Sequence, residues 1–294
     1  MRSNFIHTSF LWMVIVSMEV YGYPFTLLPQ FTMDRSIEPK NMDQPAINHV
    51  SNDLSSFSEY DTRSNEVVKP VKSWTRINQN PVSGIETTVG KRIELECSAS
   101  GTPPPEVLWF TGSGTNEQLV EYVRAITPNF YETEKEWKGI ATVNSKLVID
   151  CVTPENSGLI YCATVSGKKV KISSPTMLTV NDERVNSNCS AESDPTITLF
   201  SPTRLSNIGS NVVLPCRASG KPVPHISWVD NYNMPLSLST NSRHRVLDNG
   251  DLLIEKLLWE DMGGYTCKAK SGNRQQSVTT FLYPLRVCIH GVFI

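Results

Sequence analysis

The chain has 294 residues, which suits two domains of about 100 residues each with a further segment to spare. Its formal net charge of -2, from 27 basic and 29 acidic residues, argues against nucleic acid or an anionic membrane as the main partner. The five histidines lack zinc-ligand spacing, and neither a nucleophile motif nor a phosphate-binding glycine loop is present. The sequence therefore predicts a binding protein, with no catalytic site, metal or cofactor.

Residues 1–22 have the features of a secretory signal. Arg2 supplies the positive start, Phe10 to Val16 form a short apolar stretch, and Gly22 stands at the expected cleavage position. That stretch is far shorter than the roughly 20 apolar residues that span a bilayer, so we expect a secreted, extracellular protein without a membrane span. Residues 23–71 are rich in Ser, Asn, Asp and Pro, and we expect them to form a disordered arm.

One frame of residues occurs twice, once in residues 72–182 and once in residues 195–285. In each copy a Cys stands 12 residues before a Trp, and a Leu-x-Ile pair precedes a second Cys, which lies 15 residues after the Leu. The two sets are Cys97, Trp109, Leu147, Ile149 and Cys162, and Cys216, Trp228, Leu252, Ile254 and Cys267. This frame is typical of an all-β fold of two tandem immunoglobulin-like antiparallel sandwiches, each with a disulfide between strands B and F under a core Trp.

The first copy carries an insertion between its strands C and E. Trp109 to Leu147 covers 38 positions, against 24 from Trp228 to Leu252. The insertion includes Phe130, Tyr131 and Trp137, and aromatic side chains are enriched where protein partners bind. Two interpretations stay open: the insertion is a partner-binding segment, or it forms extra edge strands whose apolar residues fold back on the sandwich.

The linker, residues 183–194, contains Cys189. Cys151 follows strand E at the end of the first sandwich from which the linker departs, so we predict a third disulfide between Cys151 and Cys189; pairing of Cys189 with Cys288 or with another chain is the alternative. The sequon Asn188-Cys189-Ser190 makes Asn188 a candidate glycosylation site. Cys288, in a C-terminal tail of residues 286–294, has no assigned partner.

Three details distinguish the second sandwich. Tyr265 stands two residues before Cys267, which predicts a tyrosine corner, whereas the first copy has Ile160 in that slot and should have a looser corner. Pro215 lies inside strand B, cannot donate to the ladder, and should cause a local bulge or leave one carbonyl unpaired. The cluster Arg243-His244-Arg245 could meet an acidic partner or form a solvated strand edge.

The chain also resembles one family within this superfamily. The features are Trp74 before strand A, Leu95-Glu96-Cys97 with Ser-Ala-Ser-Gly-x-Pro, the linker cysteine, and the closing Thr280-Phe281-Leu282-Tyr283-Pro284. Together these are similar to the arthropod neural/ectodermal development factors, secreted two-immunoglobulin proteins that bind insulin-like peptides. The resemblance implies capture of insulin-like hormones and restraint of receptor signalling. The alternative is a soluble adhesion or guidance module that contacts cell-surface immunoglobulin proteins.

Overall fold

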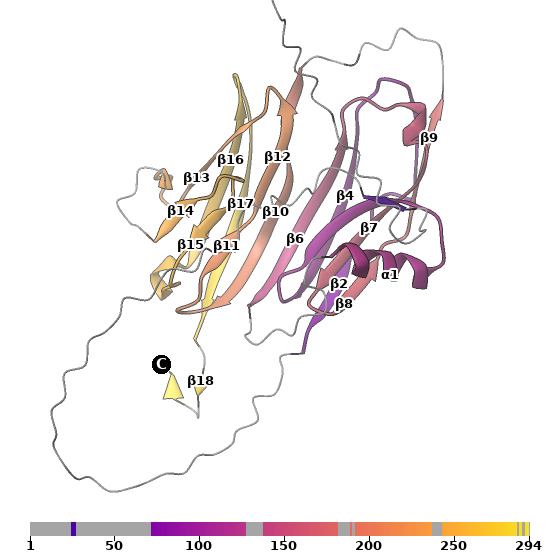
Figure 1. Cartoon of the computed structure of the whole chain (residues 1–294). Coiled ribbons are helices and arrows are strands. Elements are labelled where there is room, and N and C mark those ends of the chain that lie inside the picture. The colour runs from indigo at the N-terminus through magenta and orange to yellow at the C-terminus, as the bar shows by residue number, and fades with distance from the viewer. Residues whose placement is uncertain are drawn as a thin grey trace, which may run out of the picture.

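The computed structural model describes residues 25–27, 72–127, 138–181, 189, 192–236, 243–286, 288–289 and 292–293. These residues form two mostly antiparallel β-sandwiches that lie side by side, the first in indigo to pink and the second in orange to yellow (Figure 1). Two tandem all-β sandwiches are the predicted fold class.

The first sandwich consists of two sheets with a helix on the outside of one of them. One sheet contains β2 (Trp74–Gln79), β4 (Ile93–Thr102) and β6 (Ile140–Ile149). The other contains β1 (Phe25–Leu27), β5 (Glu106–Gly112), β7 (Gly158–Ser166), β9 (Thr176–Asn181) and β3 (Gly84–Thr88), with β8 (Lys169–Ile172) also paired to β7. Alternation in β4 explains its placement, since Ile93, Leu95 and Cys97 are buried while Glu94 and Glu96 face solvent.

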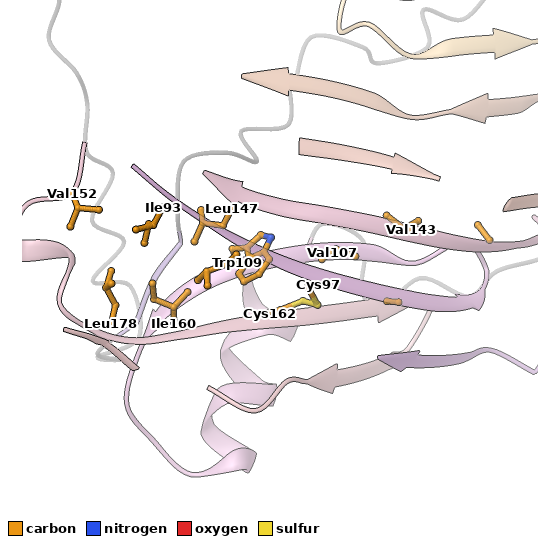
Figure 2. Packing of buried hydrophobic residues seen from close by; sticks show 13 residues of the cluster. Ile93, Cys97, Val107, Trp109, Val143, Leu147, Val152, Ile160, Cys162 and Leu178 are labelled. Carbon is orange, nitrogen blue, oxygen red and sulfur yellow. A yellow bond between two sulfur atoms is a disulfide. The ribbon is translucent and has the colours of Figure 1, made fainter. Parts of the chain in front are cut away.

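The core of the first sandwich surrounds the bridge between Cys97 and Cys162 (Figure 2). Trp109 is fully buried beside the bridge, and its indole N–H donates to Ser145 Oγ at 2.9 Å. Leu147 is buried in the same cluster, and the partly buried Ile149 packs against it. A bridge of this span contributes about 4 kcal/mol on the chain-entropy model.

The described part of the insertion is a helix, α1 (Asn116–Ile126), so the expectation of extra edge strands is wrong there. Thr115 caps the helix, because its side chain accepts from the backbone N–H of Gln118 while the Gln118 side chain accepts from Thr115 N–H. The buried residues of α1 pack on the outer face of β5 and β7. Together these side chains form a buried cluster that is separate from the core and contains Leu108, Phe110, Leu119, Tyr122, Val123, Tyr161, Ala163 and Val165.

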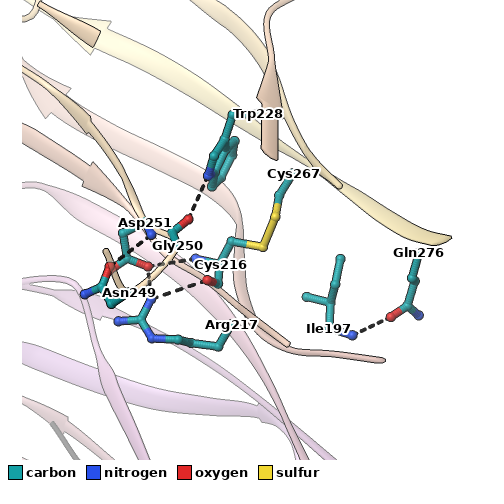
Figure 3. The surroundings of a disulfide bond; sticks show 9 residues. All are labelled: Ile197, Cys216, Arg217, Trp228, Asn249, Gly250, Asp251, Cys267 and Gln276. Atoms are coloured by element: carbon teal, nitrogen blue, oxygen red, sulfur yellow. Dashed lines mark hydrogen bonds and ion pairs between the residues drawn. A yellow bond between two sulfur atoms is a disulfide. The ribbon is translucent and has the colours of Figure 1, made fainter. Parts of the chain in front are cut away.

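Pro215 interrupts strand B of the second sandwich. It separates β11 (Val212–Leu214) from β12 (Cys216–Lys221), and β11 pairs with β15 (Leu252–Ile254), which also pairs with β14 (His244–Val246). The N–H of Cys216, next after the proline, donates to Asp251 Oδ1 at 2.9 Å (Figure 3). Asp251 also pairs with Arg217, so a side chain satisfies the backbone where the ladder stops.

The core of the second sandwich repeats the arrangement of the first with a different anchor for its Trp. The Cys216–Cys267 bridge lies beside Trp228, whose indole N–H donates to the carbonyl of Gly250 at 2.8 Å (Figure 3). Leu252 and Ile254 are completely buried in this cluster. Its remaining strands are β13 (His225–Val229), β16 (Gly263–Ser271) and β17 (Arg274–Leu285), followed by the hairpin of β18 (Cys288–Ile289) and β19 (Val292–Phe293).

The E–F corners of the two sandwiches differ as expected from their sequences. Tyr265 donates from its hydroxyl to the carbonyl of Asp261 at 3.0 Å, just after the 3₁₀ turn η4 (Trp259–Asp261). In the first sandwich Ile160 fills the equivalent slot in the core, beside η2 (Pro154–Asn156), and Tyr161 points to the opposite face. There its ring stacks on Phe110 at 5.4 Å between centroids, beneath α1.

One long strand, β10 (Ser193–Asn207), joins the two sandwiches into a single sheet. Its strand order is β13, β16, β17, β10, β6, β4, β2, with β12 paired to β10. The edge of β6 that pairs with β10 has no other partner strand among the described residues, and the described part of the chain between β5 and β6 forms α1. Figure 1 shows β10 and β6 adjacent at the centre of the molecule.

Two sequence expectations about the connecting segments need correction. Residues 25–27 pair with β5, so the expected disordered arm is wrong at these three residues. β10 begins at Ser193, so the last two positions of the expected linker belong to a strand. Cys189 is bonded to Cys151, with 5.4 Å between their Cα atoms.

Candidate functional site

The joined sheet brings residues of both sandwiches into two rows on its outer side. One row is Ile140, Leu205 and Tyr283, and the other is Thr142, Thr203 and Phe281, each from β6, β10 and β17 in turn. Directly paired residues point to the same side of a sheet, so these six side chains form one surface, which we call the joined face. The second row continues through Ser100 to Arg76 on one side and to Gly264 on the other.

Aromatic side chains are exposed at the second-sandwich end of the joined face. Phe281 is 48% exposed and Tyr283 is 38% exposed, while Leu282 between them is completely buried. Trp259 of η4 meets Tyr283 edge to face, with 6.0 Å between ring centroids, and the Arg286 guanidinium lies 5.2 Å from the Trp259 ring centre. Such a group of amphipathic rings is typical of a protein-binding surface.

The turn after β13 borders this aromatic end. The Asn231 side chain accepts a hydrogen bond from the N–H of Gly264, which stands opposite Phe281 in the sheet. A Cβ at Gly264 would crowd Asn231 Oδ1, so glycine permits this close approach. The same turn carries Tyr232, 85% exposed, and it is held by Asp230, whose carboxylate accepts from Tyr232 N–H at 2.8 Å.

The first-sandwich end of the joined face is polar. Asn78 donates to Ser100 Oγ at 2.7 Å, and Ser100 Oγ lies 2.9 Å from Thr142 Oγ1. The face therefore has an apolar part and a polar border, the usual anatomy of a protein interface.

Close backbone packing keeps the joined face in one piece. Gly139 has a φ of 101°, and a Cβ there would collide with the carbonyl oxygen of Leu205. Ser201 donates from its hydroxyl to the carbonyl of Thr142 at 2.6 Å, and Arg92 donates to Thr196 Oγ1 at 2.5 Å. β10 thus contacts the first sandwich at both ends of the junction.

A buried arginine side chain lies on the inner side of this junction. Arg204 stands opposite Ala141 and Leu282, and it is 7% exposed. Its Nη2 donates to the carbonyl of Lys138 at 2.8 Å, while its Nε and Nη1 have no hydrogen-bond partner among the residues that the structure describes. Burial lowers the pKa of Arg204 to about 10, which leaves it charged at neutral pH.

The aromatic residues that the sequence singled out in the insertion are not part of the joined face as the structure describes it. Phe130, Tyr131 and Trp137 lie outside the described residues, as does Asn188. Tyr122, from the described part of the insertion, belongs to α1 and is buried against β5 and β7, and that burial raises the pKa of its hydroxyl. The structure therefore leaves the predicted insertion site untested, and the joined face is a surface that sequence reasoning missed.

The cluster of Arg243, His244 and Arg245 is largely committed within the second sandwich. Arg243 forms two bonds to the Asp261 carboxylate, at 2.8 and 3.0 Å, and the His244 side chain is buried. Arg245 is exposed and lies 3.7 Å from Glu255. Two of the three side chains therefore face the domain itself.

Neither a membrane helix nor a metal cluster is present in the described part of the chain. Its one α-helix is neither long nor apolar enough to cross a bilayer. Across the same residues, His, Cys, Asp and Glu nowhere gather in a group of three that could hold a metal ion.

Comparison with known proteins identifies the family. A sequence model of the immunoglobulin domain matches residues 69–165 and 194–271, which is more than half of the chain. The chain belongs to the immunoglobulin domain family. Within this family of binding modules it resembles the neural/ectodermal development factor IMP-L2 of Drosophila melanogaster, with 29% identity over 72% of this chain and 77% of the fly protein.

Two further comparisons agree with this immunoglobulin assignment. The Zwei Ig domain protein zig-4 of Caenorhabditis elegans is 31% identical over 66% of this chain and 74% of its own length. The crystal structure of neural ectodermal development factor IMP-L2 superimposes with a TM-score of 0.61 at 28% identity, covering 72% of this chain and 95% of that structure. The immunoglobulin pair thus matches a relative in both sequence and architecture.

Proposed function

We propose that this immunoglobulin protein is secreted and sequesters insulin-like peptides, thereby restraining insulin-type receptor signalling. The joined face is the observation that carries the proposal, because it presents exposed aromatic rings on a surface built by both sandwiches. The resemblance to the neural/ectodermal development factor supplies the class of partner. Disulfides in both sandwiches agree with an extracellular location.

The proposed mechanism needs no chemical step. An insulin-like peptide buries apolar surface against Phe281 and Tyr283, and polar groups around Thr142 and the exposed Asn78 fix its orientation. Because one strand carries the face from one sandwich to the other, little ordering entropy is lost on binding. Bound peptide is removed from the free pool that a receptor samples.

Calorimetric titration with an insulin-like peptide tests this proposal. We expect saturation with a Kd below about 1 μM, equivalent to roughly -8 kcal/mol. Phe281→Ala and Tyr283→Ala should each weaken binding by about 10- to 100-fold, because truncation of a central aromatic anchor costs about 1–3 kcal/mol. Met177→Ala is the matched control, since Met177 is 49% exposed on a different sheet and should bind as the parent does.

Other results would redirect or overturn the proposal. Loss of binding in a Phe130→Ala, Tyr131→Ala and Trp137→Ala triple variant, with Phe281→Ala unaffected, would move the site to the insertion. Absence of heat with the parent protein, together with aggregation of beads coated with it, would favour the adhesion alternative.

A further inference from the structure

The edge of β5 that faces away from β7 pairs with no strand from residues 72–127 or 138–181. β7 pairs with one side of β5, and after Gly112 the chain turns into the helix capped by Thr115. α1 covers the face of β5 and leaves its edge unpaired within residues 72–127 and 138–181. The insertion thus produces a covered face beside an open edge.

This edge belongs to a strand that is apolar on both faces. Val107 and Trp109 point into the core, whereas Leu108 and Phe110 point under α1, and all four are at most 5% exposed. The only charged residue of the strand is Glu106 at its beginning. An apolar strand without lysine or proline at its edge readily pairs with another extended segment.

The N-terminal segment Phe25–Leu27 occupies part of that edge. Its backbone runs antiparallel to β5, with Phe25 opposite Gly112, Thr26 opposite Thr111, and Leu27 opposite Phe110 (short indigo arrow in Figure 1). Three residues make a short pairing, and isolated strand pairs of this size are marginal in water. The contact is therefore weak enough to exchange.

Tethering compensates for the short pairing. Residues 28–71 connect the segment covalently to the first sandwich, whose described part begins at residue 72. Because the segment is covalently connected, its pairing with β5 is intramolecular and does not depend on the concentration of the protein. Occupation from the same chain is thereby favoured over occupation by a second copy at ordinary protein concentrations.

We propose that the edge of β5 at Phe110–Gly112 is a strand-addition site and that the chain's own Phe25–Leu27 closes it as a tethered, exchangeable strand. The ligand class is an extended peptide that pairs through its backbone. In the free protein the N-terminal strand shields the edge from such partners. This site lies on the first sandwich, on a different sheet from the joined face, and does not depend on the hormone proposal.

Hydrogen exchange on the full chain tests the proposal. Backbone N–H groups alternate in direction along a strand, so one of the two neighbours Thr26 and Leu27 directs its N–H toward β5. A Thr26→Pro and Leu27→Pro double variant therefore removes that donor, and the amides of Phe110–Gly112 that face β1 should exchange at least about tenfold faster. A Thr62→Pro and Arg63→Pro variant, altered in the connecting residues, should exchange as the parent does.

A synthetic peptide of residues 23–30 provides the second measurement. Added in excess, it should restore slow exchange to the double variant and should leave the parent unchanged, because the parent site is already filled. Unchanged exchange in the double variant, or no rescue by the peptide, would overturn the proposal. Protection in the parent that exists only at concentrations where sedimentation shows a dimer would also overturn it, because a second copy would then supply the strand.

Discussion

His244 is a buried titratable group in the second sandwich. Burial lowers the pKa of His244, and the positive charge of Arg243 lowers it further. The carboxylates of Asp261 and Asp230 oppose this shift, and that of Asp261 lies 3.6 Å from His244 Nε2. Its ring also stacks near Tyr265, at 6.1 Å between centroids. The neutral imidazole is thus the form that the folded domain favours.

This environment predicts a pH-dependent stability. The unfolded chain takes up a proton on His244 below about pH 6.5 while the folded chain does not, so stability is complete above that pH and falls until the lower folded-state pKa is reached. Urea unfolding at pH 7.5 and pH 5.5 measures the difference. His244→Gln should reduce the loss, and His225→Gln, at an exposed position, should retain it. An unchanged loss in His244→Gln would refute this assignment.

Asp261 responds to pH in a separate range. Burial raises its pKa, but hydrogen bonds from Arg243 and from the N–H of Leu258 outweigh that effect, so the pKa is lowered overall. A lowered carboxyl pKa stabilises the fold above the ordinary value near 4, and this contribution is lost only as the pH falls through the folded-state pKa. The Asp261 effect therefore begins only below about pH 4, whereas the His244 effect begins near pH 6.5.

At the scale of single elements, α1 shows what the sequence contained and what was overlooked. Leu119, Tyr122, Val123 and Ile126 follow the i, i+3, i+4, i+7 spacing of an amphipathic helix. Thr115 and Gln118 form a capping box in front of them. Attention to aromatic content alone suggested exposed surface, whereas the spacing and the cap together indicate a helix that folds back.

We expect α1 to contribute substantially to stability. Val123 is completely buried and Leu119 is 4% exposed, so Val123→Ala and Leu119→Ala should lower the free energy of unfolding by about 1–4 kcal/mol. Urea denaturation followed by fluorescence measures this change. Asn116→Ala, at an exposed position in the first turn, should cost less than about 0.5 kcal/mol. Equal effects of the three variants would mean that α1 does not pack as described.

Local signals predicted the sandwiches well because the frame residues have roles within one domain. The Cys, Trp and Leu-x-Ile spacings reflect a two-sheet core, and the missing N–H of Pro215 predicts a local irregularity at the point where the structure divides the strand. The joined face was not predictable in this way. Its pairs connect Ile140 to Leu205 and Leu205 to Tyr283, and backbone pairing between distant strands leaves no fixed pattern in either segment.

At the scale of the whole molecule, β10 contributes to both cores. Leu199 packs against the core of the first sandwich, and the next residue, Phe200, packs against that of the second. Because one strand serves both cores and pairs with strands of each, unfolding one sandwich removes contacts from the other. The two sandwiches should therefore unfold together.

We expect a single cooperative transition in urea, seen alike by fluorescence and circular dichroism. Leu199→Ala and Phe200→Ala should each shift the whole transition, by about 1–3 kcal/mol, because each truncates a side chain at the junction. Val223→Ala is the control, since Val223 is 87% exposed in a loop and should leave the midpoint in place. Two transitions, of which a variant moves only one, would show that the sandwiches unfold independently.

The shared strand also limits how such a protein can be divided. Tandem immunoglobulin domains are commonly treated as independent and interchangeable, so that each can be expressed alone or moved between receptors. In this protein, dividing the chain before Ser193 would remove β10, the strand that completes the sheet of the first sandwich. The edge of β6 would then be unpaired. The two sandwiches are therefore inherited together as one structural unit. A gene rearrangement that separated them would yield two aggregation-prone fragments in place of two folded, functional domains.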